Sequence, residues 1–132
     1  MKHGLSVFIL LMALLVSGCN KVSVAENAPE KIVNIAKYQL VYTPGQAVPE
    51  TLLTLKLLGD NIRSVRGEIV GVEMSMGTIP LFFQKDGQGH FAAQYLLGVC
   101  SEPDMFWQVR LTITDNEGEV HRVTDQFQVQ YL

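Results

Sequence analysis

Four sulfur-bearing side chains are the residues of this sequence best suited to bind a ligand. Two are methionines at i and i+2 in "VEMSMGTIP", and two stand in "GVCSEPDMFW": Met74, Met76, Cys100 and Met105. All other methionines precede residue 19. Thioether and thiolate ligands favour Cu(I), a soft ion, over Mg, Ca or Mn, and zinc rarely accepts thioethers. The pattern therefore indicates a Cu(I) site, although Ag(I) would suit the same ligands.

A packing role for the same side chains is the alternative interpretation. Methionine fills irregular gaps in cores, and a free cysteine is among the most buried residue types. The four sulfur residues could form a hydrophobic cap together with Phe82 and Phe106. We interpret the nearby acids Glu73, Glu102 and Asp104 as solvated residues at the rim of the cap. The residue types alone leave both interpretations open.

The elements that must position these residues are β-strands. Hydrophobic residues recur with period two in seven segments, and no long stretch with period 3.6 is present. Turn signals such as "GDN", "KDGQG" and "DNEG" separate the segments. This pattern predicts an all-β fold, an immunoglobulin-like β-sandwich of about seven antiparallel strands. The predicted strands cover residues 36–42, 51–58, 64–76, 79–84, 90–97, 106–114 and 119–131.

Two of the predicted strands flank the sulfur residues. In segment 106–114, apolar side chains occupy the odd positions from Trp107 to Ile113, which predicts one buried face. In segment 64–76, the apolar positions change from odd before residue 70 to even from residue 70 onward. We therefore expect a β-bulge near Gly67 or Gly71.

Strand order predicts which end of the sandwich holds the sulfur residues. If successive strands alternate in direction, the third-to-fourth and fifth-to-sixth connections lie at the same end. These two connections contain all four sulfur residues. His90 and His121 follow other turns and fall at the opposite end. A histidine-rich divalent metal site is therefore not expected.

The N-terminal segment predicts export and lipidation. Lys2 and His3 precede an apolar run that ends at Val16, which is the layout of a secretory signal peptide and is shorter than a typical membrane span. The sequence "LVSGC" resembles a bacterial lipobox, whose cysteine, here Cys19, becomes the lipidated first residue. We expect a signal peptide over residues 1–18, a lipidated tether over 19–33 and a β-sandwich domain over 34–132. The resemblance to a lipobox implies a sorting rule under which Asn20 after the cysteine favours the outer membrane, and we expect the protein to face the periplasm.

Charge and cysteine content exclude two classes of function. Removal of residues 1–18 leaves 132 − 18 = 114 residues with 9 basic and 13 acidic side chains, a net charge of 9 − 13 = −4. A mildly acidic domain without a basic patch argues against nucleic acid, and leaves the lipid anchor as the expected membrane contact. A reactive cysteine needs a nearby base, a resolving cysteine or a helix N-terminus. Cys100 has none of these, so we expect no enzymatic activity.

The second half of the chain resembles the YtkA-like and FixH-type periplasmic domains. The resemblance covers about Val70 to Val129. Its most specific residues are Met74-x-Met76-Gly77, Gly89-x-Phe91-x-Ala93 and Trp107. It implies an immunoglobulin-like sandwich in a setting of copper handling and cytochrome oxidase assembly, with methionine ligands and Trp107 packed beside or over the site. The stretch "CSEPDMFW" departs from the family pattern, so ligand roles for Cys100 and Met105 do not follow from the resemblance.

Two functions are expected from these observations. The first is a membrane-anchored periplasmic Cu(I)-binding protein, a metallochaperone or buffer that serves cytochrome oxidase assembly through a copper-trafficking partner. The alternative is a lipid-anchored interaction module of the bacterial cell envelope with no metal. That module would dock a partner through strand edges or through Phe82 and Phe83.

Overall fold

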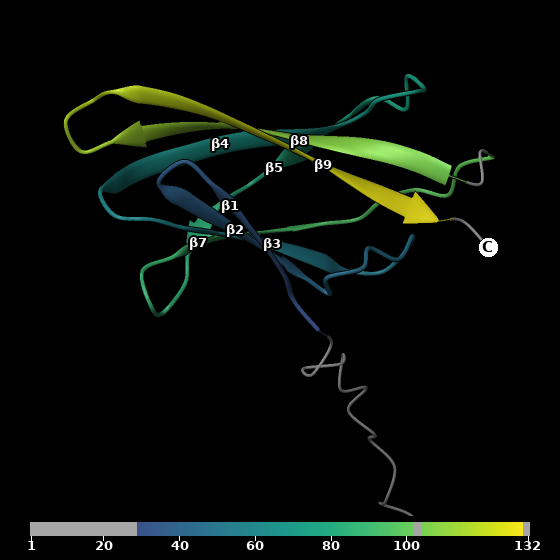
Figure 1. Ribbon diagram of the computed structural model, residues 1–132, viewed down its shortest axis with the longest axis horizontal. Coiled ribbons are helices and arrows are strands. Elements are labelled where there is room, and N and C mark those ends of the chain that lie inside the picture. Colours follow the sequence, from purple (N-terminus) through teal and green to yellow (C-terminus); the bar gives the residue numbers. More distant parts are fainter. Residues whose placement is uncertain (1–28, 102–103, 131–132) are drawn as a thin grey trace, which may run out of the picture.

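The chain folds as a two-layered β-sandwich in the computed structural model, which describes residues 29–101 and 104–130 (Figure 1). These residues form nine strands and no helix, so none of them forms a helix able to cross a membrane. The first sheet contains β1 (Lys31–Ile35), β2 (Tyr38–Thr43), β3 (Leu53–Leu58), β7 (Phe91–Tyr95) and β6 (Gln84–Lys85), in that order. The second sheet contains β5 (Thr78–Leu81), β4 (Ile62–Gly71), β8 (Asp104–Asp115) and β9 (Val120–Gln130).

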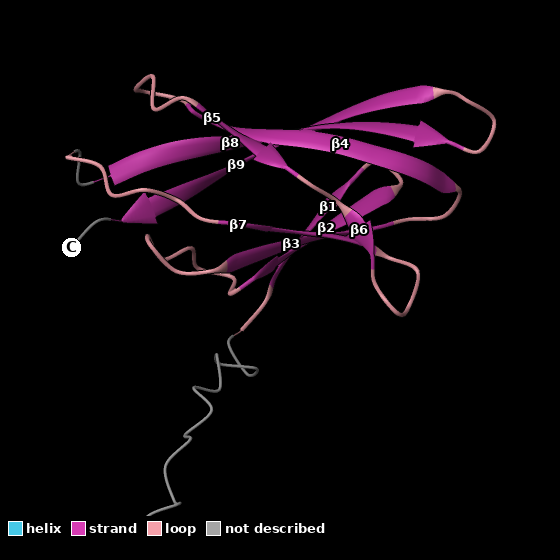
Figure 2. Ribbon diagram, turned by 180° about the vertical axis from the view of Figure 1, so that it is seen from behind, coloured by secondary structure: helices cyan, strands magenta, loops and turns pink. Residues whose placement is uncertain are grey.

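The predicted all-β fold and sandwich architecture are confirmed. All neighbouring strands are antiparallel, and the two sheets face each other as separate layers (Figure 2). Alternation drives this arrangement, because odd residues of β8 from Met105 to Ile113 are buried and even ones face outward. The buried face predicted for segment 106–114 is therefore present.

Side chains from both sheets form one hydrophobic core. Burial of each such side chain contributes roughly 1.5–3 kcal/mol relative to exposure. The core residues lie between Tyr38 and Val129, so a chain that begins at Asn20 retains all of them. Fully buried members include Leu40, Leu53, Leu55, Leu57, Ile69, Leu97, Met105, Trp107, Val109, Leu111, Ile113 and Val129.

The structure differs from the predicted strands in three main respects. The strand predicted over 64–76 ends at Gly71, which leaves both methionines of "MSMG" in a loop. The strand predicted over 79–84 is split, because β5 pairs with β4 in the second sheet and β6 pairs with β7 in the first. The additional strand β1 begins at Lys31, within the stretch expected to be tether. Cys19 and the predicted signal peptide lie outside the described residues.

The β-bulge predicted near Gly67 or Gly71 is wrong. The register of β4 with β8 is unbroken from Ser64 onward, and the shift lies between Ile62 and Ser64. Gly67 faces the core, where a Cβ atom would come within 2.5 Å of Leu111 Cδ2. Both glycines thus occupy inward positions that have no room for a side chain. Because glycine has no side chain, positions 67 and 71 interrupt the run of apolar residues at odd positions. The sequence therefore looks as if the strand changed its buried face.

A hydrogen bond between a buried tyrosine and a partly buried aspartate ties the two sheets together. The Tyr42 hydroxyl on β2 donates to Asp125 Oδ2 on β9 at 2.6 Å, and the Tyr42 ring lies 5.6 Å from that of Phe127. β9 forms an edge of its sheet, and an inward-pointing charge on an edge strand discourages pairing with other chains. Desolvation, aided by Asp125, raises the pKa of Tyr42 far above its usual value.

Alkaline pH should destabilise the fold through Tyr95. Burial raises the pKa of the Tyr95 phenol above its usual value of 10.0, so the unfolded chain loses that proton first. The contribution of the protonated Tyr95 phenol to the free energy of unfolding is complete below pH 10. It is lost as the pH rises further, by up to about 1.4 kcal/mol per pH unit. Urea unfolding at pH 9 and pH 11 should show a smaller loss of stability in Tyr95→Phe than in the parent. Equal losses in the two proteins would contradict this assignment.

Candidate metal centre

Three sulfur atoms from two loops meet at one end of the sandwich. The Cys100 thiol lies 3.7 Å from Met74 Sδ and 3.8 Å from Met76 Sδ. The β4–β5 and β7–β8 connections, which carry these residues, lie at the same end in both ribbon views (Figures 1 and 2). We call this end, defined by Met74, Met76 and Cys100, the sulfur end. Strand order alone predicted the shared end but not the contacts.

The methionine loop is held by the backbone of Phe106 at the start of β8. Val72 N–H donates to the Phe106 carbonyl at 2.9 Å, and Phe106 N–H donates to Glu73 Oε2 at 2.9 Å. The Glu73 carboxylate thus replaces the backbone carbonyl that would otherwise accept from Phe106 N–H. The backbone hydrogen bonds between β4 and β8 end at this point. Met76 N–H then donates to the Met74 carbonyl, which makes a tight turn that brings both side chains to the same thiol.

Gly71 allows this loop to fold back over the core. A Cβ atom at position 71 would come within 2.6 Å of the Met74 carbonyl oxygen and within 2.7 Å of Met105 Cε. Gly77 closes the loop at a φ of 80°, a conformation that glycine adopts without strain. Both glycines therefore serve the geometry of the loop, for different steric reasons.

The three sulfur residues differ in their exposure. The Cys100 side chain is 8 % exposed, Met76 is partly buried and Met74 is 37 % exposed. Cys100 is a free thiol. The cluster therefore extends from an edge of the core to the surface, with the thiol at its inner side.

The fourth predicted sulfur residue lies beneath the loop. Met105 is fully buried, and its terminal methyl lies at Gly71, whereas the sulfur contacts of Cys100 are to Met74 and Met76. Trp107, predicted to pack beside the site, lies opposite Gly71 in the register and is fully buried. Its Nε1–H has no hydrogen-bond partner. Met105 and Trp107 therefore lie in the core beneath the start of the methionine loop.

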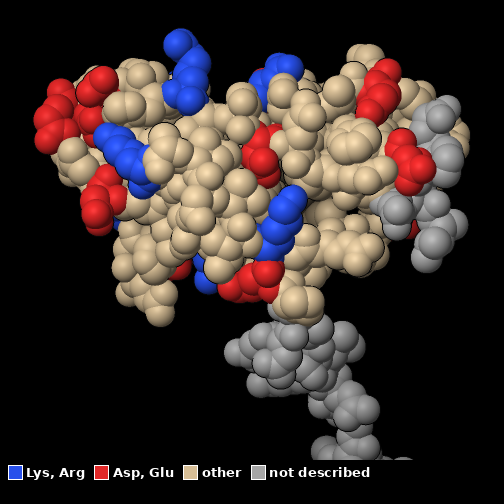
Figure 3. All heavy atoms as spheres, viewed as in Figure 1, with Lys and Arg blue, Asp and Glu red and all other residues tan. Residues whose placement is uncertain are grey.

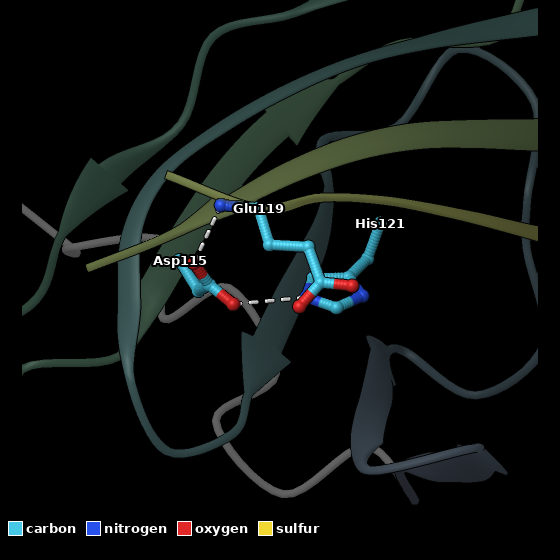
Figure 4. Close-up of side chains that lie close together, drawn as sticks. All are labelled: Asp115, Glu119 and His121. Atoms are coloured by element: carbon cyan, nitrogen blue, oxygen red, sulfur yellow. Dashed lines mark hydrogen bonds and ion pairs between the residues drawn. The ribbon is translucent and has the colours of Figure 1, made fainter. Parts of the chain in front are cut away.

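A second group of possible metal ligands lies in the β8–β9 hairpin, at the opposite end. Asp115 Oδ2 is 3.0 Å from His121 Nε2, and Glu119 Oε2 is 4.0 Å from the same nitrogen (Figure 4). The hydrogen bonds from His121 and from Glu119 N–H hold the pKa of Asp115 below its usual range. The Lys37 ammonium lies 3.4 Å from His121 Nε2, where it would repel a cation. The three side chains therefore stabilise the hairpin turn.

Sequence reasoning did not single out this group. Its signal would have been Asp115, Glu119 and His121 spaced across the turn "DNEGEVH". The other histidine among the described residues, His90, lies beside Asp86 just before β7, also away from the sulfur end.

The comparisons with known proteins address the fold alone. No protein-family profile and no curated protein matches the chain. A crystal structure of a DUF4426 family protein from Pseudomonas aeruginosa is similar, with a TM-score of 0.50 and 9 % sequence identity. The match covers 76 % of this chain and 94 % of that one. This likeness supports the sandwich architecture of the domain.

Gly71→Ala should destabilise the methionine loop. The added methyl group would meet a backbone oxygen that cannot yield without moving the loop, at a cost of about 1–3 kcal/mol. Gly87→Ala is the matched control, because a Cβ atom there meets nothing within 4 Å. Chemical denaturation of both variants checks this. A stability of Gly71→Ala equal to that of the control would contradict the packing described.

Proposed function

We propose that the domain binds one Cu(I) ion between Met74 Sδ, Met76 Sδ and Cys100 Sγ. The observation that carries this proposal is the pair of sulfur–sulfur distances, 3.7 and 3.8 Å. A metal–sulfur bond of about 2.3 Å, typical of zinc–thiolate bonds, sets sulfur ligands about 3.8 Å apart in a tetrahedral site and about 4.0 Å apart in a trigonal one. Both thiol–thioether distances thus match those between sulfur ligands of one ion.

The donor set favours a soft monovalent ion. Two thioethers are uncharged, and a thiolate balances the single charge of Cu(I), so the loaded centre is neutral. Neutrality matters because Cys100 is almost buried, and burying a net charge is costly. Neither His90 nor His121 lies at the sulfur end, and Glu73 is already engaged by Phe106 N–H. Hard divalent ions would lack their preferred oxygen and imidazole ligands.

The uneven exposure of the ligands suits transfer of copper better than permanent storage. Met74 is the most exposed of the three, so an incoming ligand can displace it first while Cys100 still holds the ion. In this proposal Cys19 carries the lipid anchor and the domain works as a metallochaperone or buffer at the outer membrane. A copper-trafficking or oxidase-assembly protein would be its partner.

A metal-free interaction module is the second candidate function. The observation that favours it is Phe82, which is 77 % exposed beside a hollow also lined by Gln84 and Gln94. This surface lies away from the sulfur cluster, on the side of β6 and β7. Partner binding that depends on Phe82, together with no Cu(I) binding, would decide for this alternative.

A Cu(I) competition titration against a chromophoric chelator tests the copper proposal. The chain beginning at Asn20, reduced and anaerobic, should hold one equivalent tightly. Cys100→Ser should weaken binding most, because it removes the only charged ligand, and Met74→Leu should weaken it by roughly tenfold or more, since even outer-shell changes cost 10–100-fold.

Met105→Leu is the matched control for the two ligand variants. It makes the same thioether-to-alkyl change at a buried sulfur outside the pair that accepts from the Cys100 thiol, so binding should match the parent. Loss of binding in Met105→Leu would make Met105 a ligand and overturn the three-sulfur assignment. If the chelator keeps all the copper from the parent, the proposal fails.

A further inference from the structure

Exposed apolar side chains surround the sulfur cluster. Val99, 60 % exposed, adjoins Cys100, and Val72 and Phe106 are exposed where the methionine loop joins β8. The first sheet adds Leu52 and Leu96, both exposed, at the paired ends of β3 and β7. Apolar side chains gathered at one place on a surface mark a site of interaction. We call Val72, Met74, Val99 and Phe106 the apolar rim.

Carboxylates border the apolar rim and basic groups are scarce there. Glu50, whose N–H donates to the Leu97 carbonyl, Glu73 and Asp104 are exposed at this end. The visible face of the molecule shows acidic and no basic side chains at the end where β9 finishes (Figure 3). None of the described residues in the loops at this end, 46–52, 72–77 and 96–101, is lysine or arginine, and the Lys31 ammonium on β1 lies 5.6 Å from the centre of the Tyr42 ring.

This combination excludes two of the possible occupants. A second copy of the same end would bring like carboxylates together, which is repulsive. A bilayer of anionic lipids would also repel the acidic border. The surface that complements both features is an apolar face bordered by lysine or arginine.

We propose that the sulfur end docks against a partner protein whose contact face is apolar at its centre and basic at its border. The partner exchanges Cu(I) with the centre, so this inference rests on the proposed function. Lys31 pairs with Tyr42, Tyr42 with Leu55 and Leu55 with Ala93, so β1 begins level with the middle of β7. Ten residues separate Cys19 from Pro29 (29 − 19), and they span at most about 36 Å. A lipidated Cys19 would therefore keep Pro29, just before β1, within about this distance of the membrane.

Binding of synthetic amphipathic peptides to the metal-free, reduced chain beginning at Asn20 tests the docking surface. A leucine–lysine peptide should bind and shift the amide resonances of residues 72–76 and 98–100, and a leucine–glutamate peptide of equal length should not. Added salt should weaken the binding. The double variant Glu50→Gln/Asp104→Asn should bind about fivefold more weakly at low salt, since each exposed charge contributes modestly. Val99→Ser should also weaken it.

Asp60→Asn and Val120→Ser are the matched controls, because both residues are exposed at the opposite end. They should bind the basic peptide as the parent does. Equal binding of both peptides, perturbation elsewhere on the domain, or no binding at all would overturn the proposal. Tighter binding to phosphatidylcholine or phosphatidylglycerol vesicles would overturn it in favour of a lipid surface. Because the protein carries no metal here, these outcomes are independent of the copper titration.

Discussion

The backbone of Phe106 is the constraint on which the arrangement of the sulfur end depends. Its carbonyl accepts from Val72 N–H and its N–H donates to Glu73, so both groups of one residue are paired with the methionine loop. Backbone polar groups in a folded protein are almost always paired, and an unpaired one is costly when it is buried. The loop is therefore bound to β8 at a defined point, and the two methionines turn over Gly71 from there.

The same constraint connects the core to the candidate centre. Met105 and Trp107 flank Phe106 on the opposite face of β8, and both are fully buried. The loop thus rests on side chains that the hydrophobic core holds in place, while its own sulfur atoms reach the surface. A rigid scaffold that presents variable loops at one end is a common way to position binding groups. Here one loop joins two strands of the second sheet, and the other crosses from the first sheet to the second.

The two ends of the sandwich use their polar groups differently. In the β8–β9 hairpin, the Asp115 carboxylate accepts from Glu119 N–H and lies beside His121. Its oxygen atoms are therefore already hydrogen-bonded within the turn. At the sulfur end, the thiol and thioethers make only weak contacts with one another. Soft atoms that are not committed to strong hydrogen bonds remain available to an incoming ion. This difference is why the sulfur cluster is the stronger candidate.

The sequence by itself determined the fold class, most strands and the shared end of the sulfur residues. Period-two alternation is a local property, so segments such as 106–114 could be recognised without the rest of the chain. It did not determine where β4 ends, because Gly67 and Gly71 lack side chains for reasons of close packing that only the neighbouring strand reveals. Nor could it divide segment 79–84 between two sheets.

Tertiary structure alone decided which sulfur atoms meet. The spacing of Met74 and Met76 is compatible with one strand face, with a loop, or with a buried cap. Hydrogen bonds between residues more than 30 positions apart, such as Glu73 with Phe106, select the loop and turn it toward Cys100. Such contacts depend on how strands pair across the sheet, and the local sequence carries no record of that pairing. Met105 is buried beneath the loop for the same reason, since β8 places it on the inward face.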